Sequence, residues 1–146
     1  MSTTRLALND VHRVRDACFC LQAQRTARAL ARRFDEALRP LDLTNGQFSL
    51  LMMLARPQPW NVGEAAAMLA MDRTTLTAAL KPLTRRGLAA VSPDPDDRRG
   101  RLIALTPHGH ALMAKALPIW EQAHAELDAV ADGSVRAGMR ALERAA

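Results

Sequence analysis

Residues 71–106 read MDRTTLTAALKPLTRRGLAAVSPDPDDRRGRLIALT, and the elements expected in this stretch decide the fold. The segment 72–86 begins with an aspartate that can cap a helix, and its polar residues recur on one helical face. A glycine that can end a helix comes next, and a strand is then expected at Leu88–Ser92. A turn rich in proline, aspartate and arginine separates this strand from a second one, expected at Leu102–Leu105.

The order of helix, strand, basic turn and strand is that of a winged helix. Just upstream, the segment Asn61–Leu69 opens with a capping pattern and predicts another helix, which the short turn Ala70–Met71 joins to the helix after it. The two helices make a helix-turn-helix. Its second helix can enter a major groove while the cationic hairpin reaches the neighbouring backbone or minor groove. We therefore expect double-stranded DNA to be the partner of this chain.

Helical periodicity in the rest of the chain predicts a mainly α protein, with the hairpin wing as its β-structure. Apolar residues recur at helical spacing over Asp10–Leu38, which predicts one long helix that Pro40 ends. Further helices are expected at Gly46–Leu54, 107–131 and Val135–Ala145. The amphipathic helices near the termini predict a dimerisation lobe from about residues 9–39 and 107–146, flanking a DNA-binding lobe at about residues 44–106.

The composition suits one domain that binds a polyanion. The chain has 146 residues, of which 49% are hydrophobic, and this is enough for a single core. Lysine and arginine number 20 against 15 aspartate and glutamate residues, and the net charge of +5 favours polyanionic partners. Nearly all the cations are arginines, which suit contact with phosphate and guanine, although the codon bias of a GC-rich genome would produce the same excess.

Several classes of function are disfavoured by the sequence. No apolar run approaches the roughly 18 residues that a membrane span needs. The first residues become charged before a signal-peptide core can form, so we expect a cytoplasmic protein. The sequence has no zinc-type spacing of cysteine and histidine, no glycine-rich phosphate loop and no HExxH motif. We therefore expect no enzyme, no metal site and no cofactor.

Three segments carry a resemblance to a known family. They are the turn before the second helix, LRPLDLTNGQF at Leu38–Phe48; the expected recognition helix and its exit at Asp72–Leu88, which end in LTRRGL; and the wing and its exit, DRRGRLIALTPHG at Asp97–Gly109. In this order along the chain they resemble the MarR family. The resemblance implies a homodimeric winged-helix transcription regulator, usually a repressor, whose first and last helices form the dimer interface. It also implies a pseudo-palindromic operator that receives two recognition helices, and in many members release by a small aromatic acid, a lipophilic compound or an oxidant.

The DNA-binding candidates are short hydroxyl and cationic side chains on the helix 72–86 and in the wing. They are Arg73, Thr74, Thr75, Thr77 and Lys81 for the major groove, and Arg98, Arg99 and Arg101 for the wing. The alternatives are threonines that only cap and solvate a surface helix, and arginines in a solvated charged turn.

Four residues next to these candidates have expected roles of their own. Acidic residues near the wing tip would repel phosphate, so we expect Asp97 to pair with an arginine and orient it. Arg85 and Arg86 can equally cap the end of their helix through its dipole. Pro82 lies inside the same helix and should bend it or leave a carbonyl unpaired.

The run ACFCL at Ala17–Leu21 resembles the start of the organic-hydroperoxide sensors of this family, which makes Cys18 a redox candidate. Those sensors hold their cysteine with tyrosine hydroxyls, whereas this chain contains no tyrosine, and Phe34 and Asn45 stand near the expected positions. The alternative is a buried apolar cysteine. A disulfide between Cys18 and Cys20 is unfavourable on a helix, because residues two apart point away from each other.

A ligand pocket is expected between the first helix, the second helix and the start of the helix 107–131. The candidate lining residues are His12, Arg15, Phe34, Phe48, Met52, Met53 and Trp60. Methionine and phenylalanine at helical spacing are also typical of plain core. The sequence thus leaves three functions open: a repressor released by a ligand, a regulator controlled by cysteine oxidation, and a winged helix that binds another protein.

Overall fold

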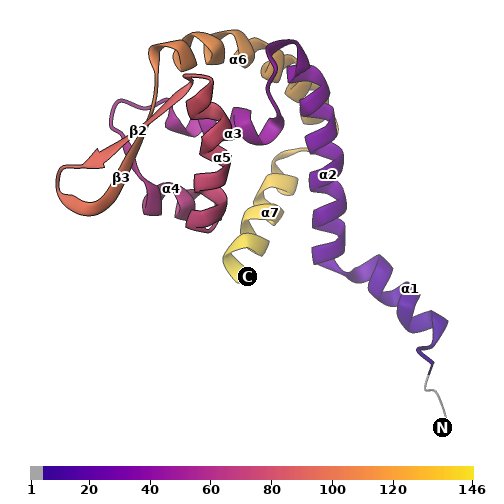
Figure 1. Cartoon of the computed structure of the whole chain (residues 1–146). Coiled ribbons are helices and arrows are strands. Elements are labelled where there is room, and N and C mark those ends of the chain that lie inside the picture. The colour runs from indigo at the N-terminus through magenta and orange to yellow at the C-terminus, as the bar shows by residue number, and fades with distance from the viewer. Residues whose placement is uncertain (1–4) are drawn as a thin grey trace.

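The computed structural model describes residues 5–146 as a set of helices with a small antiparallel sheet at one edge (Figure 1). The helices are α1 Leu8–Ala17, α2 Phe19–Leu38, α3 Asn45–Leu54, α4 Val62–Met68, α5 Arg73–Arg85, α6 Pro107–Asp128 and α7 Gly133–Ala145, with a 3-10 turn, η1, at Arg39–Leu41. The strands are β1 Trp60–Asn61, β2 Ala89–Asp94 and β3 Asp97–Leu105. The prediction of a mainly helical winged helix-turn-helix is confirmed. Over the described residues, we find no helix with the length and apolar character of a membrane span.

The core lies where α3, α4 and α5 meet the sheet, and the end of α2 and the start of α6 close it. Leu51, Leu76, Leu83 and Ile103 are completely buried. Burying each such side chain stabilises the fold by about 2 kcal/mol. The N-terminal half of α2 and the whole of α7 lie outside this core (Figure 1).

β3 is the central strand of the sheet and pairs antiparallel with β1 on one side and β2 on the other. The hairpin of β2 and β3 extends beyond the helices and is the wing (Figure 1). Both wing strands are longer than predicted, and the turn between them is only Pro95–Asp96. The short strand β1, in which Trp60 lies opposite Ile103, was not predicted, because two residues are too few to show alternation.

The segments that connect α5 to the wing and the wing to α6 explain the glycine and threonine residues found there in the sequence. Gly87 has φ 68 and ends α5, and the backbone N–H of Leu88 donates to the carbonyl of Leu83 at 2.9 Å. After the wing, the Thr106 hydroxyl donates to the carbonyl of Gly87 at 2.5 Å and accepts from the backbone N–H of Gly109 at 3.0 Å. A Cβ at Gly109 would lie 2.2 Å from the Leu88 carbonyl oxygen, so only glycine fits where α6 begins against the end of α5.

The single long helix predicted over 10–38 is wrong, because the chain breaks at Cys18 into α1 and α2. Cys18 has an extended backbone (φ −75, ψ 110), and its thiol accepts the backbone N–H of Leu21 at 3.4 Å. The thiol therefore acts as the N-cap of α2. The spacing of the apolar residues did not predict this role. Pro82, by contrast, does not end α5, which continues to Arg85 although the carbonyl of Ala78 loses its helical donor.

The helices near the two ends of the chain bury no residue in this single chain. α1 projects away from the rest of the molecule, and α7 follows the end of α6 after a break in the helix (Figure 1). Both carry exposed apolar side chains, namely Leu8, Val11 and Val14 on α1 and Val135, Met139 and Leu142 on α7, with Phe19 at the start of α2. These faces need a partner if they are to leave water.

Candidate nucleic-acid interface

The start of α5 is fixed by Asp72, whose carboxylate accepts the backbone N–H of Thr75 at 2.7 Å and the Thr75 hydroxyl at 2.8 Å. These hydrogen bonds lower the pKa of Asp72, with the backbone bond contributing most. The Thr75 hydroxyl uses its hydrogen in the bond to Asp72, so its oxygen can only accept a hydrogen bond from a further group. The same holds for Thr77, whose hydroxyl donates to the Arg73 carbonyl at 2.7 Å.

All five major-groove candidates are exposed on α5. Since Thr75 and Thr77 present acceptors, they suit the amino groups of adenine or cytosine rather than guanine. Thr74 is exposed and keeps a hydroxyl that can both donate and accept. Arg73 and Lys81 supply the positive charge of this face.

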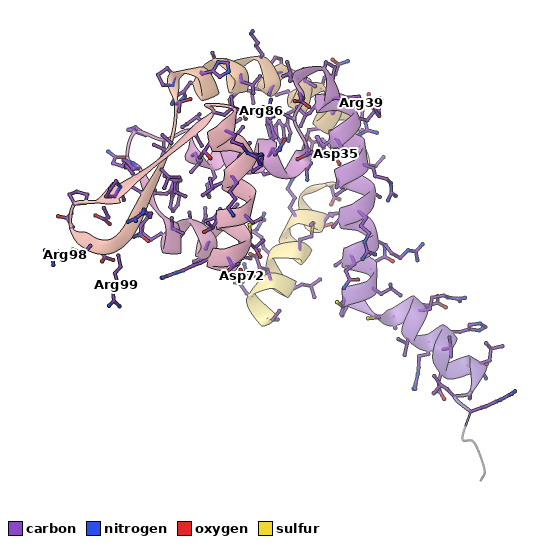
Figure 2. All side chains as sticks on the ribbon, viewed as in Figure 1. Asp35, Arg39, Asp72, Arg86, Arg98 and Arg99 are labelled. Carbon is purple, nitrogen blue, oxygen red and sulfur yellow. The ribbon has the colours of Figure 1, made fainter. Side chains whose placement is uncertain are left out.

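The wing tip is shaped by its own carboxylates. Asp94 accepts the backbone N–H of Asp96 at 2.9 Å, and Asp97 accepts the backbone N–H of Arg99 at 2.9 Å. A Cβ at Gly100 would lie 2.9 Å from the Cβ of Asp94, so the two strands approach closely here. Over residues 5–146, no arginine side chain forms an ion pair with Asp97, so the expected pairing is not formed in this chain, and the carboxylate holds the backbone of Arg99 instead. Arg98 and Arg99 project from the tip (Figure 2).

The structure brings most of the helix and wing candidates to one place. A hollow of about 280 Å³ between α5 and β3 is lined by Arg73, Thr77, Asp97, Arg99 and Arg101. An adjoining hollow of about 170 Å³ shares two of these residues and adds Lys81. The helix α5 and the strand β3 thus place their cations along one face. Thr74, Thr75 and Arg98 lie outside both hollows.

Gly63, at the start of α4, was missed by the sequence reasoning. A Cβ there would lie 2.7 Å from Nη2 of Arg73 and 3.2 Å from Oδ1 of Asn61. Asn61 in turn caps α4 by accepting the backbone N–H of Gly63 at 2.8 Å. The glycine therefore leaves room for the Arg73 guanidinium beside the N-terminus of α4. The Asn-x-Gly pattern was visible in the sequence only as a capping signal.

Arg86 differs from its neighbour Arg85, which is exposed. Arg86 was expected to be able to cap its own helix, but its guanidinium donates to the carbonyls of Leu41 and Asp42 instead, at 3.4 and 2.6 Å. It thus binds the end of η1. On the other side of that turn, the carboxylate of Asp35 accepts the backbone N–H of Asn45 at 2.6 Å.

The predicted ligand pocket is not assembled by one chain. Phe34 and Phe48 are 6% and 5% exposed and belong to the core, where Phe48 stacks on Trp120 with ring centroids 6.2 Å apart. Met52 and Met53 are partly buried against the same core, and the indole N–H of Trp60 donates to the Met53 carbonyl at 3.0 Å.

His12 and Arg15 are exposed on α1, which extends away from that core (Figure 1). Arg15 bonds its neighbour Asp16 at 2.6 and 2.8 Å, and this contact lowers the pKa of Asp16. The break at Cys18 separates His12 and Arg15 from the aromatic core, because the axis of α1 changes direction there relative to that of α2.

The two cysteines are free thiols in different surroundings. Cys18 is half-buried at the helix break, and Cys20 is exposed and accepts from the side chain of Gln24 at 3.3 Å. Because Cys18 has an extended backbone, the two residues are not on one continuous helix as the sequence suggested. Among residues 5–146 no group of three or more histidine, cysteine or acidic side chains is placed to hold a metal ion.

Comparison with known proteins points to one family. The sequence model of the MarR family matches residues 43–100, which cover α3, α4, α5 and most of the wing. The HTH-type transcriptional repressor NicR of Pseudomonas putida is 34% identical over 98 residues, 67% of this chain, and the match spans only 60% of the length of that relative. The organic hydroperoxide resistance transcriptional regulator of Bacillus subtilis is 31% identical over 102 residues, which are 70% of this chain and 68% of that protein.

A solved structure agrees over a longer part of the chain. The crystal structure of the M. tuberculosis transcriptional regulator MosR in complex with DNA superposes with a TM-score of 0.81 at 38% identity. The superposition covers 88% of this chain and 95% of that one. It therefore extends from the winged unit into the flanking helices.

Proposed function

Because the chain belongs to the MarR family of winged helix-turn-helix transcriptional regulators, we propose that it is a repressor that binds a pseudo-palindromic operator as a homodimer. The observation that carries this proposal is the shared face of α5 and the wing, where Arg73, Arg99 and Arg101 gather around one hollow. A helix and a hairpin that present cations side by side suit a major groove and the backbone or minor groove next to it.

In this proposal α5 enters the major groove and the wing follows the neighbouring backbone. Arg73, Thr74, Thr75, Thr77 and Lys81 act in the major groove, and Arg98, Arg99 and Arg101 act from the wing. Asp97 shapes the wing by holding the backbone N–H of Arg99 at 2.9 Å. Since operator DNA is the partner, we place the protein in the cytoplasm and expect neither catalysis nor a cofactor.

The apolar faces of α1 and α7 support the homodimer. Val11 and Val14 of α1 are 44% and 59% exposed, and Val135 and Met139 of α7 are 46% and 58% exposed. Their spacing places each set on one side of its helix. A second copy that covered these faces would unite the segments about 9–39 and 107–146 into a dimerisation lobe. It would also bring two copies of α5 to one duplex.

Release from the operator by a small aromatic or lipophilic effector completes the proposal. The effector site requires more than one chain, because His12 and Arg15 lie on α1, away from the aromatic core. A second candidate, release by oxidation, is favoured by the position of Cys18. Cys18 is the residue between α1 and α2, and its thiol caps α2, so oxidation of the thiol would weaken this cap.

The test is selection of DNA from a random duplex library by the purified protein, followed by fluorescence anisotropy of the selected duplex and a scrambled one. We expect a preference of at least about a thousandfold and a steep salt dependence. Sedimentation of the protein alone should give twice the mass of one chain. Failure to enrich any sequence would refute the proposed function, and the winged helix would then be a candidate for binding a protein.

A further inference from the structure

One arginine at the end of the recognition helix α5 makes its hydrogen bonds away from the DNA-facing hollows. Nη1 of Arg86 donates to the Asp42 carbonyl at 2.6 Å, and Nη2 donates to the Leu41 carbonyl at 3.4 Å. These carbonyls end η1, where Asp42 has φ 53. The Asp42 carboxylate is 4.0 Å away and its side chain is 96% exposed, whereas the Arg86 side chain is 31% exposed. The guanidinium is therefore held by backbone carbonyls more than by an ion pair.

Arg86 donates to the turn η1, which lies in the corner between α2 and α3, and further hydrogen bonds hold this corner together. Asp35 of α2 accepts the backbone N–H of Asn45 at 2.6 Å. Thr44 and Gln47 form a reciprocal capping box at the start of α3. Arg86 lies at the end of α5 nearest this corner (Figure 2). The corner follows directly from the end of α2, because η1 begins at Arg39 and α2 ends at Leu38.

Elsewhere the end of α5 is separated from this corner by an open groove. The groove has a volume of about 410 Å³, and Asp35, Thr44 and Pro82 are among the residues that line it. Over the described part of the chain, the bonds of Arg86 are the only side-chain hydrogen bonds that join α5 to α2, η1 or α3. The leucines of α5 also pack in the common core, but apolar packing is not directional.

A small tilt of α5 at its Arg86 end displaces the opposite end of the helix, at Arg73, by a much larger distance. The helix has 13 residues. It is therefore about 20 Å long, and a tilt of about 5° at Arg86 would move Arg73 by almost 2 Å. Contacts with base edges tolerate errors of only about 0.5 Å. The two hydrogen bonds of Arg86 therefore restrain the tilt of α5 at the end where a small change moves Arg73 the most.

We propose that Arg86 is a positioning residue for operator recognition, which fixes the angle of α5 by holding the carbonyls of Leu41 and Asp42. In a dimer this angle sets the distance between the two recognition helices, and with it the spacing of half-sites that the protein accepts. The proposal rests on the proposed function, because half-site spacing has meaning only for a dimer on an operator.

The experiment compares the full chain with Arg86→Ala, Arg86→Lys and Asp42→Asn, and uses Arg85→Ala as the matched control that removes one neighbouring charge. The probe is the duplex that the wild-type protein selects, together with versions that carry one extra base pair between the half-sites. Anisotropy gives the affinity for each duplex over a salt series, and circular dichroism checks that each variant is folded.

The insertion should weaken wild-type binding about a hundredfold, and it should weaken Arg86→Ala binding less than about tenfold. On the unmodified duplex, Arg86→Ala should bind about tenfold more weakly than wild type, with an unchanged salt slope. Arg85→Ala and Asp42→Asn should keep the wild-type spacing preference. Arg86→Lys keeps the charge but reaches only one carbonyl, so its spacing preference should be intermediate.

Three results would overturn the inference. A salt slope that falls by about one per chain in Arg86→Ala would make the residue a phosphate contact. Wild-type spacing preference in Arg86→Ala, or in Arg86→Lys if the alanine variant does not fold, would show that it only stabilises the fold. A loss in Asp42→Asn as large as that in Arg86→Ala would assign the effect to the ion pair. Absence of any selected duplex would instead count against the proposed function.

Discussion

Replacing Arg99 by alanine tests the wing directly. Between residues 5 and 146, the Arg99 guanidinium has no hydrogen bond or ion pair, and only its backbone N–H is used, by Asp97 at 2.9 Å. The substitution therefore removes no contact within the chain, and thermal unfolding should be unchanged. Its side chain lines the hollow beside Arg73, so operator affinity should fall by about 1 to 3 kcal/mol per chain, roughly fivefold to 150-fold.

The assay is anisotropy of the selected duplex between about 50 and 200 mM salt. Loss of one phosphate contact per chain should reduce the slope of log K against log salt by about 0.9, or about 1.8 for a dimer. Arg28→Ala is the control, because it removes the same charge from an exposed position on α2. If Arg99→Ala kept the wild-type affinity and slope at every salt concentration, the wing would lie outside the interface.

Four further outcomes are expected. Ala70 has φ 51 in the turn before α5, so Ala70→Gly should raise stability by about 1 kcal/mol and Tm by about 3 °C; a lower Tm would show that this turn is not strained. Gly109→Ala should cost about 2 kcal/mol and lower Tm by about 6 °C, because the new Cβ would lie 2.2 Å from the Leu88 carbonyl; an unchanged Tm would refute that contact. The pKa of Asp72 is lowered in the fold, so its stabilising cap is present above the ordinary aspartate pKa and is lost as pH falls through the lower folded value. Asp72→Asn should therefore flatten the dependence of Tm on pH below about pH 4, and equal curves for both proteins would contradict this. Cys18→Ser should leave operator binding intact and abolish release by an organic hydroperoxide if oxidation controls the protein, whereas release that persists would exclude Cys18 as the sensor.

The parts of the fold that the sequence predicts correctly depend on local signals. The capping box of Thr44 and Gln47, the cap at Asp72 and the stop at Gly87 each act within a few residues. Their physical effect is the same in any chain that contains them. The helix-turn-helix and the wing could therefore be located before any tertiary contact was known.

What could not be predicted depends on contacts between distant residues or on unusual roles. Arg86 binds a carbonyl 44 residues earlier in the chain, and no local pattern indicates that partner. The guanidinium of Arg73 fits beside Gly63 only because the helix-turn-helix folds the two together. Cys18 ends one helix and caps the next with a thiol, where glycine, proline or a hydroxyl residue would be the usual signal.

The unpartnered helices at the two ends have a consequence for folding. α1 has 10 residues and α7 has 13, and neither buries a side chain in its own chain. Helices shorter than about 12 to 15 residues are marginal in water without tertiary packing. In the proposed homodimer, the contacts that keep α1 helical would come from the second copy, so the folding of α1 would be coupled to assembly. The helix content of the N-terminal end would then depend on protein concentration, and dilution would unfold α1 while the winged unit stays intact.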